Sequence, residues 1–204
     1  MFQIIVDSAA NIPAELVKQY HIKVLSFVNY VNGEKLICFD PELTYEEERA
    51  KGKTYYDAMR NGADVKTSLI STGDFEAAFR KVMEDGEDVL YFSLSKNISG
   101  TYNSARIAME ELMENPPMGR KIRIIDALNA SLAQGILAIY ASEMRDKGME
   151  IDEVYDILKT YPAKMNGVFT VGDLKCILAK CCERSEQQLN QAAITIFYSS
   201  LVRI

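Results

Sequence analysis

Short apolar runs alternate along the chain with longer segments in which apolar residues recur with the period of a helix. The apolar runs predict strands at residues 2–6, 88–95 and 121–126, with another strand beginning at residue 167. The periodic segments predict helices that begin at Pro13 and that cover residues 44–61, 71–85, 99–113, 131–147 and 152–161. Strands that alternate with helices predict an α/β fold with a parallel sheet and helices on both faces.

One part of the chain departs from this alternation. Residues 21–31 are predicted to form a single strand, Asn32 and Gly33 have the composition of a hairpin turn, and residues 34–39 are predicted to return as the partner strand. The helix expected at residues 44–61 contains Gly52, so we expect it to start weakly. The next helix has Ser71 in position to cap it, with Asp74 as an imperfect capping box.

Four loops are rich in hydroxyl or carboxylate groups at places where a strand is expected to lead into a helix. A parallel sheet binds its ligands outside the carboxyl ends of its strands, where such loops gather. Serine and aspartate are also ordinary helix caps, so each loop taken alone is explained by capping, and only their coincidence favours a binding site. The four loops are Asp7-Ser8, Thr67-Ser68, residues 93–101 and residues 126–131.

Composition narrows the class of protein. The 204 residues are 48% hydrophobic and 25% charged, which is typical of a globular protein. A net charge of -6 argues against nucleic acid as a partner, because binding to phosphates needs a basic surface. No apolar run reaches the ~18 residues of a membrane span, and the first residues do not have the pattern of a signal peptide. We therefore expect a cytoplasmic protein with no integral membrane association.

Metal binding and catalysis have few candidate residues. The cysteines Cys38, Cys176, Cys181 and Cys182 lack zinc-ligand spacing, and we expect them to be reduced. Asp7 and Asp126 are the only candidate carboxylate pair for binding a metal ion, and we expect no bound metal. The single histidine, His21, is the only candidate imidazole base, and nucleotide-binding glycine motifs are absent. We expect a protein that is not an enzyme and has no cofactor.

The loop that contains Ser99, Gly100 and Thr101 carries the clearest chemistry. It lies where a helix is expected to begin, so free backbone N–H groups, hydroxyls and the positive end of the helix dipole would surround one small volume. Such a volume suits one anionic group, either a phosphate or a carboxylate. A phosphotransferase or a hydrolase that uses Ser99 remains an alternative, although it would need a base.

Five segments resemble those of the DegV family, in their order and spacing, from residue 2 to about residue 175. The most specific of them is SGTYNSA at residues 99–105. The other four are Asp7-Ser8, Thr67-Ser68-Leu69-Ile70-Ser71, Ile125-Asp126 and residues 169–175 with the sequence FTVGDLK.

The resemblance implies a fatty-acid-binding protein that itself does no chemistry. A long-chain fatty acid such as palmitate or oleate would be held by its carboxylate at Thr67 and Ser99. Asp7, Ser8, Ser68, Gly100, Thr101 and Asp126 would be neighbours of that site. Such proteins are similar to the acyl-carrying subunits of bacterial fatty acid kinase, which present the carboxylate to a separate ATP-binding subunit that makes acyl phosphate.

The chain departs from the DegV pattern in three places. Ile70 stands where the family usually has proline, and Ala127 stands where it usually has serine. After about residue 175 the pattern stops, where the family continues with a second domain. We therefore expect a DegV-type N-terminal α/β domain at residues 1–164 and the start of an incomplete second α/β domain at residues 165–204, with a truncated or frame-shifted tail. A truncated remnant that acts only as an interaction module is a further alternative.

Overall fold

The larger sheet is four-stranded and parallel in the computed structural model, which describes residues 1–167. Its strand order is β2-β1-β6-β7. The strands are β1 (Phe2–Asp7), β2 (Ile22–Leu25), β6 (Asp88–Ser93) and β7 (Ile122–Asp126). Strand β1 pairs in parallel with both β2 and β6, so the carboxyl end of β1 lies near the middle of the sheet edge. The predicted α/β class and the parallel sheet are confirmed.

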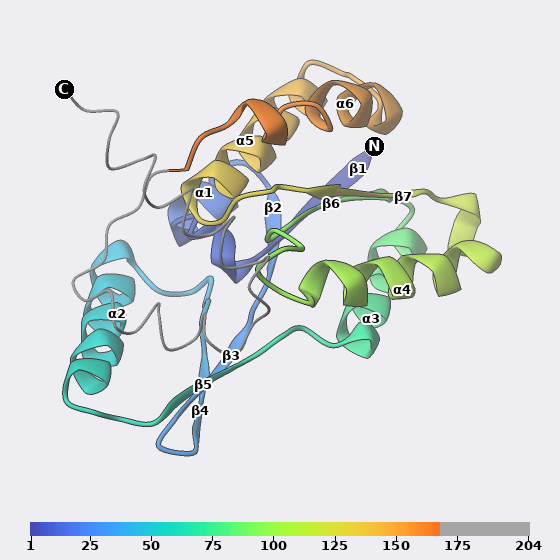
Figure 1. Cartoon of the computed structure of the whole chain (residues 1–204). Coiled ribbons are helices and arrows are strands. Elements are labelled where there is room, and N and C mark those ends of the chain that lie inside the picture. The colour runs from blue at the N-terminus through green and yellow to red at the C-terminus, as the bar shows by residue number, and fades with distance from the viewer. Residues whose placement is uncertain (168–204) are drawn as a thin grey trace. The chain divides into compact units, whose positions relative to one another are not determined.

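Helices cover both faces of this sheet, as expected (Figure 1). Successive side chains of a strand point to opposite faces, so Ile4 and Val6 pack in one core and Ile5 packs in the other. The core that contains Ile4 is closed by α1 (Ala14–Gln19), α5 (Leu132–Asp146) and α6 (Ile151–Leu158). The core that contains Ile5 is closed by α3 (Thr72–Glu84) and α4 (Thr101–Glu114). Residues 1–167 also contain short 3-10 helices, namely η1 (Ser8–Ala10), η2 (Pro117–Gly119) and η3 (Pro162–Lys164).

A second sheet has three antiparallel strands in the order β4-β3-β5. These are β3 (Val28–Val31), β4 (Glu34–Ile37) and β5 (Val65–Ser68). The predicted hairpin is present, and Asn32 and Gly33 both have the positive φ that a tight hairpin turn requires.

Two predictions for this region are wrong. The chain does not form one strand over residues 21–31 but leaves the parallel sheet after Leu25 and enters the small sheet at Val28. Thr67 and Ser68 do not lie in a loop at the carboxyl edge of the parallel sheet, because they end strand β5 of the small sheet. Ile70, which stands where a proline was expected, is buried in the core beneath α3 and α4.

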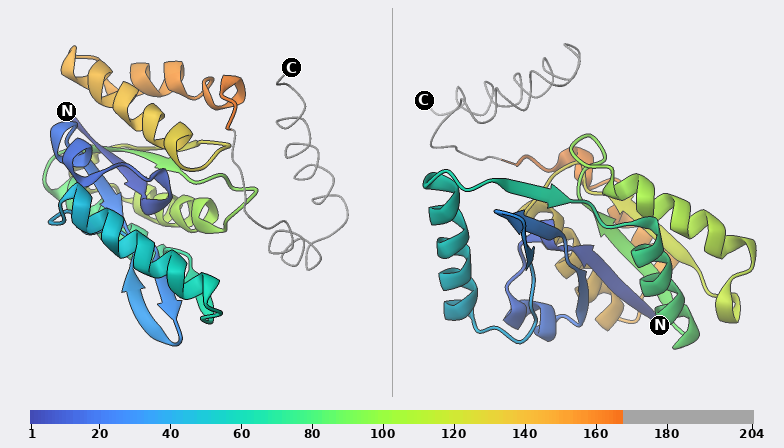
Figure 2. Two further views of the ribbon diagram at one scale, coloured as in Figure 1. Left: turned by 90° about the vertical axis from the view of Figure 1, so that its left-hand side faces the viewer. Right: turned by 90° about the horizontal axis from the view of Figure 1, so that it is seen from below.

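Helix α2 (Tyr45–Arg60) stands beside the small sheet (Figures 1 and 2). The expectation of a weak start is wrong, because Thr44 and Glu47 form a full capping box. Ser71 and Asp74 likewise form a full capping box at α3. No residue of α2 is buried, although the helix is 16 residues long. Its inward face therefore borders a space that protein atoms do not fill.

The expected second domain at residues 165–204 lies almost wholly outside the described residues, as does the strand expected from residue 167. Cys176, Cys181 and Cys182 also lie outside them. Within residues 1–167 no helix is long and apolar enough to cross a membrane.

Candidate ligand-binding site

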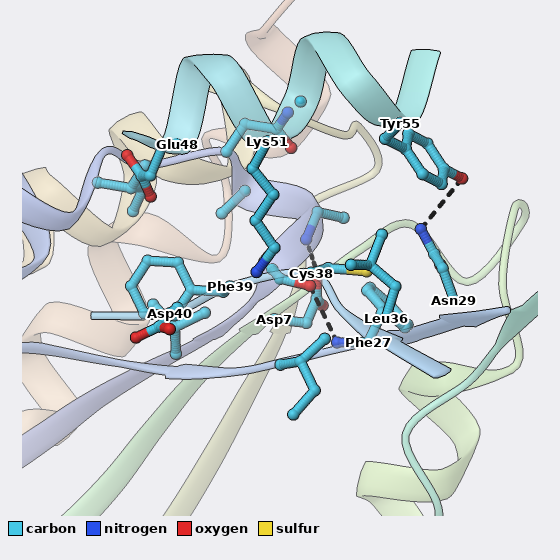
Figure 3. Close-up of a pocket in the computed structure, with 18 of the residues that line it drawn as sticks. Asp7, Phe27, Asn29, Leu36, Cys38, Phe39, Asp40, Glu48, Lys51 and Tyr55 are labelled. Atoms are coloured by element: carbon cyan, nitrogen blue, oxygen red, sulfur yellow. Dashed lines mark hydrogen bonds between the residues drawn. The ribbon is translucent and has the colours of Figure 1, made fainter. Parts of the chain in front are cut away.

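A cavity of about 730 Å³ lies between the carboxyl end of β1, the small sheet and α2. Figure 3 shows α2 on one side of it and strands of the small sheet on the other. Much of its lining is apolar and comes from segments far apart in the sequence. These apolar residues include Ile12, Val24, Phe27, Leu36, Phe39, Leu43, Tyr55, Leu69 and Ile98.

Five of the eight residues predicted for the site line this cavity, namely Asp7, Ser8, Thr67, Ser68 and Ser99. Gly100, Thr101 and Asp126 are not among the residues that line it. The cavity thus brings together hydroxyl groups from η1, from the end of β5 and from the loop that precedes α4.

Thr67 presents a hydroxyl group with no partner among the described residues. The residue is exposed and lies opposite Asn29 in the pairing of β3 with β5. The amide of Asn29 donates a hydrogen bond of 3.1 Å to the hydroxyl oxygen of Tyr55 on α2. Thr67 is therefore free to bond a ligand, and a polar bridge between the small sheet and α2 lies next to it.

Ser99 is tied into the start of α4. Its hydroxyl lies 2.8 Å from the hydroxyl of Thr101 and accepts a bond of 3.2 Å from the Thr101 amide. Thr101 is fully buried and is not among the residues that line the cavity. A Cβ added to Gly100 would lie 3.3 Å from the Leu69 side chain, so the loop approaches the end of β5 closely. This contact brings the Ser99 loop beside the Thr67 segment.

Asp7, the last residue of β1, and Ser8, which follows it, build the back of the cavity. The Ser8 hydroxyl accepts a bond of 2.9 Å from the Phe27 amide and so fixes the segment between the two sheets. The carboxylate of Asp7 is fully buried and accepts bonds from the Ala9 amide (3.1 Å), the Tyr91 hydroxyl (2.8 Å) and the Leu94 amide (2.8 Å). Burial raises the pKa of Asp7, although these donors oppose the shift. Burial also raises the pKa of Tyr91 well above its ordinary value.

Asp126 has a local role at the end of β7. It accepts bonds from the backbone amides of Lys96 (3.3 Å) and Leu128 (3.0 Å). Strand β6 separates β7 from β1, so the backbones that carry Asp126 and Asp7 lie roughly 10 Å apart. That spacing does not favour one ion held by both carboxylates. Residues 1–167 contain no group of three or more His, Cys, Asp and Glu residues placed to hold a metal.

The arrangement does not assemble a serine nucleophile with a base. The Ser99 hydroxyl bonds to Thr101, and in the described part of the chain it has no histidine or carboxylate partner. His21 precedes β2 and borders a different hollow of about 570 Å³, at the amino ends of the strands.

Sequence reasoning missed the contribution of β3, β4 and α2. Asn29, Lys51 and Tyr55 line the cavity, yet none of them belongs to a loop at the edge of the parallel sheet. The hairpin at Asn32-Gly33 signalled a separate pair of strands, but the pattern carries no information on where that pair packs.

The fold and the cavity define the class: an α/β protein whose parallel sheet carries a small antiparallel sheet and a capping helix over a large, mostly apolar cavity. The DegV family model, which describes an uncharacterised protein family, matches residues 1–180. The chain belongs to the DegV family.

Curated relatives agree with this assignment. A DegV domain-containing protein of Clostridium perfringens is 37% identical over 174 residues, which cover 85% of this chain and 57% of the relative. Another from Lactococcus lactis is 33% identical over 176 residues, with the same two coverages. The chain thus spans a little over half the length of the curated relatives it matches.

Solved structures show the same fold. A DegV lipid-binding protein from Thermotoga maritima matches with a TM-score of 0.67 and 29% identity, over 81% of this chain and 56% of that one. A second Thermotoga maritima protein, described as revealing a fatty-acid-binding function, has a TM-score of 0.66 and 29% identity over the same shares. A DegV family protein from Thermus thermophilus, described by its fatty acid binding, has a TM-score of 0.66 and 25% identity over 79% of this chain and 53% of that one.

Proposed function

We propose that this chain binds one long-chain fatty acid in the cavity beside α2 and holds its carboxylate with the hydroxyl groups of Thr67 and Ser99. The observation that supports the proposal is that Thr67 and Ser99 both line one large, mostly apolar cavity. Relatives of the same fold are described as fatty-acid-binding proteins, which supports the same class of ligand here.

The size of the cavity fits such a ligand. Small-molecule sites in proteins occupy roughly 300–1,000 Å³ and are lined mainly by apolar groups with a few polar ones. The cavity, at about 730 Å³, lies in this range, and its hydroxyl groups are few beside its apolar side chains. Each methylene that leaves water contributes about 0.8 kcal/mol, so an acyl chain would be retained mainly by its tail and oriented by its head group.

We propose that the protein acts as a carrier of the bound fatty acid. The protein would present the carboxylate to a separate ATP-binding kinase subunit and would not react with it. In support, the hydroxyl of Ser99 has no base beside it among the described residues. Acyl phosphate trapped with hydroxylamine should form only when this chain, the kinase subunit, oleate and ATP are all present. Formation without the kinase subunit would show that this chain is itself an enzyme.

The head-group assignment is tested by titrating lipid-free protein with oleate. The double variant Thr67→Val, Ser99→Ala is expected to bind oleate about 10- to 100-fold more weakly, because each charge-assisted hydrogen bond contributes about 1.5–3 kcal/mol and part of this is replaced by water. Valine keeps the branched shape that suits strand β5.

Thr160→Val is the matched control for this experiment. The Thr160 hydroxyl donates to the Ile157 carbonyl at the end of α6 and does not line the cavity. This variant should bind oleate as the unaltered chain does. Equal oleate affinity in the double variant and the control would remove Thr67 and Ser99 from the site.

A further inference from the structure

Lys51 is a cation on the face of α2 that borders the cavity. Glu48, Lys51 and Tyr55 are spaced so that they share one side of the helix, and all three line the cavity. Figure 3 shows the Lys51 side chain extending from α2 into the cavity, toward the segment that carries Cys38 and Phe39. The side chain is half-buried.

The two cations nearer the end of α2 are paired at its surface, whereas Arg49 lines the cavity but is exposed. Lys53 is 76% exposed and pairs with Asp57 at 2.5 Å, and Arg60 pairs with the same carboxylate at 2.8 Å. Lys51 has neither an ion pair nor a hydrogen bond among the described residues. The Lys51 ammonium thus has no counter-charge bonded to it and is available to pair with an anionic ligand.

The charge of Lys51 also acts on Cys38, another residue that lines the cavity. Partial desolvation raises the pKa of the Cys38 thiol, and the positive charge of Lys51 opposes that shift, as does a backbone hydrogen bond. A charge that acts on the Cys38 sulfur lies close to it, which agrees with the direction of the side chain in Figure 3.

Lys51 and Thr67 line the same cavity. Lys51 and Tyr55 are one helical turn apart, so their Cβ atoms lie about 5–6 Å from each other. Tyr55 bonds to Asn29, and Asn29 lies opposite Thr67 across the β3–β5 ladder. A flexible lysine stem can therefore bring its ammonium toward an anion held at Thr67.

The remaining charges of the cavity are mostly negative. Asp7, Asp40 and Glu48 line it, and the other lining cation, Arg49, is exposed. The Asp7 oxygens are already occupied by three donors. Without Lys51, an incoming carboxylate would meet hydroxyl groups and carboxylates but no enclosed positive charge.

We infer that Lys51 is a specificity-determining residue that selects an ionised carboxylate over an uncharged head group on the same acyl chain. The inference rests on the proposed function, because it presumes that an acyl ligand occupies the cavity. By this inference, the described α/β unit supplies the ligand with a positive counter-charge in addition to the hydroxyl groups.

The test compares oleate with oleyl alcohol, which has the same chain and no charge. Lipid-free full-length protein, Lys51→Met and Lys53→Met are each titrated with both compounds by displacement of a fluorescent fatty-acid analogue. Methionine keeps an unbranched chain that suits a helix but removes the charge. Lys53→Met is the matched control, since it removes a lysine from the same helix outside the cavity. Far-ultraviolet circular dichroism checks that each variant folds.

Lys51→Met is expected to weaken oleate binding about tenfold, equivalent to about 1.4 kcal/mol, and to leave oleyl alcohol unchanged, while Lys53→Met alters neither. Unchanged oleate affinity in Lys51→Met, with clear binding by the unaltered chain, would overturn the role of Lys51 and leave the proposed function standing. If Lys51→Met bound oleate and oleyl alcohol more weakly by the same factor, selection by charge would also be overturned, because the result would show that Lys51 contributes by packing. Failure of the unaltered chain to bind either compound would overturn the proposed function together with the inference.

Discussion

The carboxyl group of Asp7 shows how a single residue supports the cavity. It accepts a hydrogen bond from the Leu94 amide, which joins the end of β1 to the loop after β6. It also accepts a hydrogen bond from the hydroxyl group of the buried Tyr91. Two of its three donors are backbone amides that have to be satisfied where water is excluded. Asp7 thus holds together the two loops that form the back of the cavity.

Asp7→Asn is expected to lower the free energy of unfolding by about 1–3 kcal/mol. An amide offers only one oxygen to the three donors, so at least one of them would face an NH₂ group. Urea unfolding of Asp7→Asn measures the loss, with Asp85→Asn at an exposed position as the control.

The same variant tests the titration of Asp7. Burial raises the pKa of Asp7 above its ordinary value of 3.8, so the folded chain holds this proton more tightly than the unfolded chain. The resulting stabilisation is fully present below that value and is lost as the pH rises through the folded pKa. Because asparagine does not titrate, the stability difference between the two proteins should shrink with rising pH across this window. A difference that stays constant from about pH 3 to about pH 8 would contradict the raised pKa.

Individual site residues were predictable to different degrees. Asp7 ends β1, and Ser8 and Ser99 follow strands of the parallel sheet, so the general rule for such sheets placed all three at one edge. Thr67 and Ser68 were selected by the same rule, yet they reach the cavity from the small sheet. Gly100 and Thr101 were selected as parts of an anion site, but the buried Thr101 side chain stabilises the start of α4.

At the scale of elements, α2 differs from the other long helices of the described chain. Helix α3 buries Phe75, Phe79, Val82 and Met83, whereas α2 buries no residue. A side-chain hydrogen bond from Asn29 to Tyr55 links it to the small sheet. A helix attached in this way can open locally while the core stays folded.

A pair of cap variants distinguishes local from global opening. Thr44→Ala removes the cap of α2, and Ser71→Ala removes the equivalent cap of α3; each loses about 1 kcal/mol of helix stability. Thr44→Ala should speed amide exchange in α2 without changing the midpoint of thermal unfolding. Ser71→Ala should lower that midpoint, because α3 belongs to a core. Equal effects of the two variants on the midpoint would show that α2 unfolds together with the core.

The elements themselves were largely predictable, but their placement was only partly so. Apolar runs such as the one that ends at Phe92 are typical of strands buried on both faces, and they predict the parallel sheet directly. The break after Leu25 carries no glycine or proline, so the pattern of residues 21–31 reads as one strand. The capping box at Thr44 was visible in the sequence, and it outweighs the cost of Gly52 within α2.

At the scale of the whole molecule, the described α/β unit already presents a cavity with an apolar lining and a polar region. The chain spans a little over half the length of its curated relatives. Whether a chain of this length retains a fatty acid can be measured directly.

The most direct measurement is native mass spectrometry of the protein as purified from a bacterial host, followed by denaturing extraction of whatever is bound. We expect a mass increase equal to one long-chain fatty acid per chain, with the same acid recovered in the extract. Protein that carries no ligand and fails to take up added oleate would contradict the account.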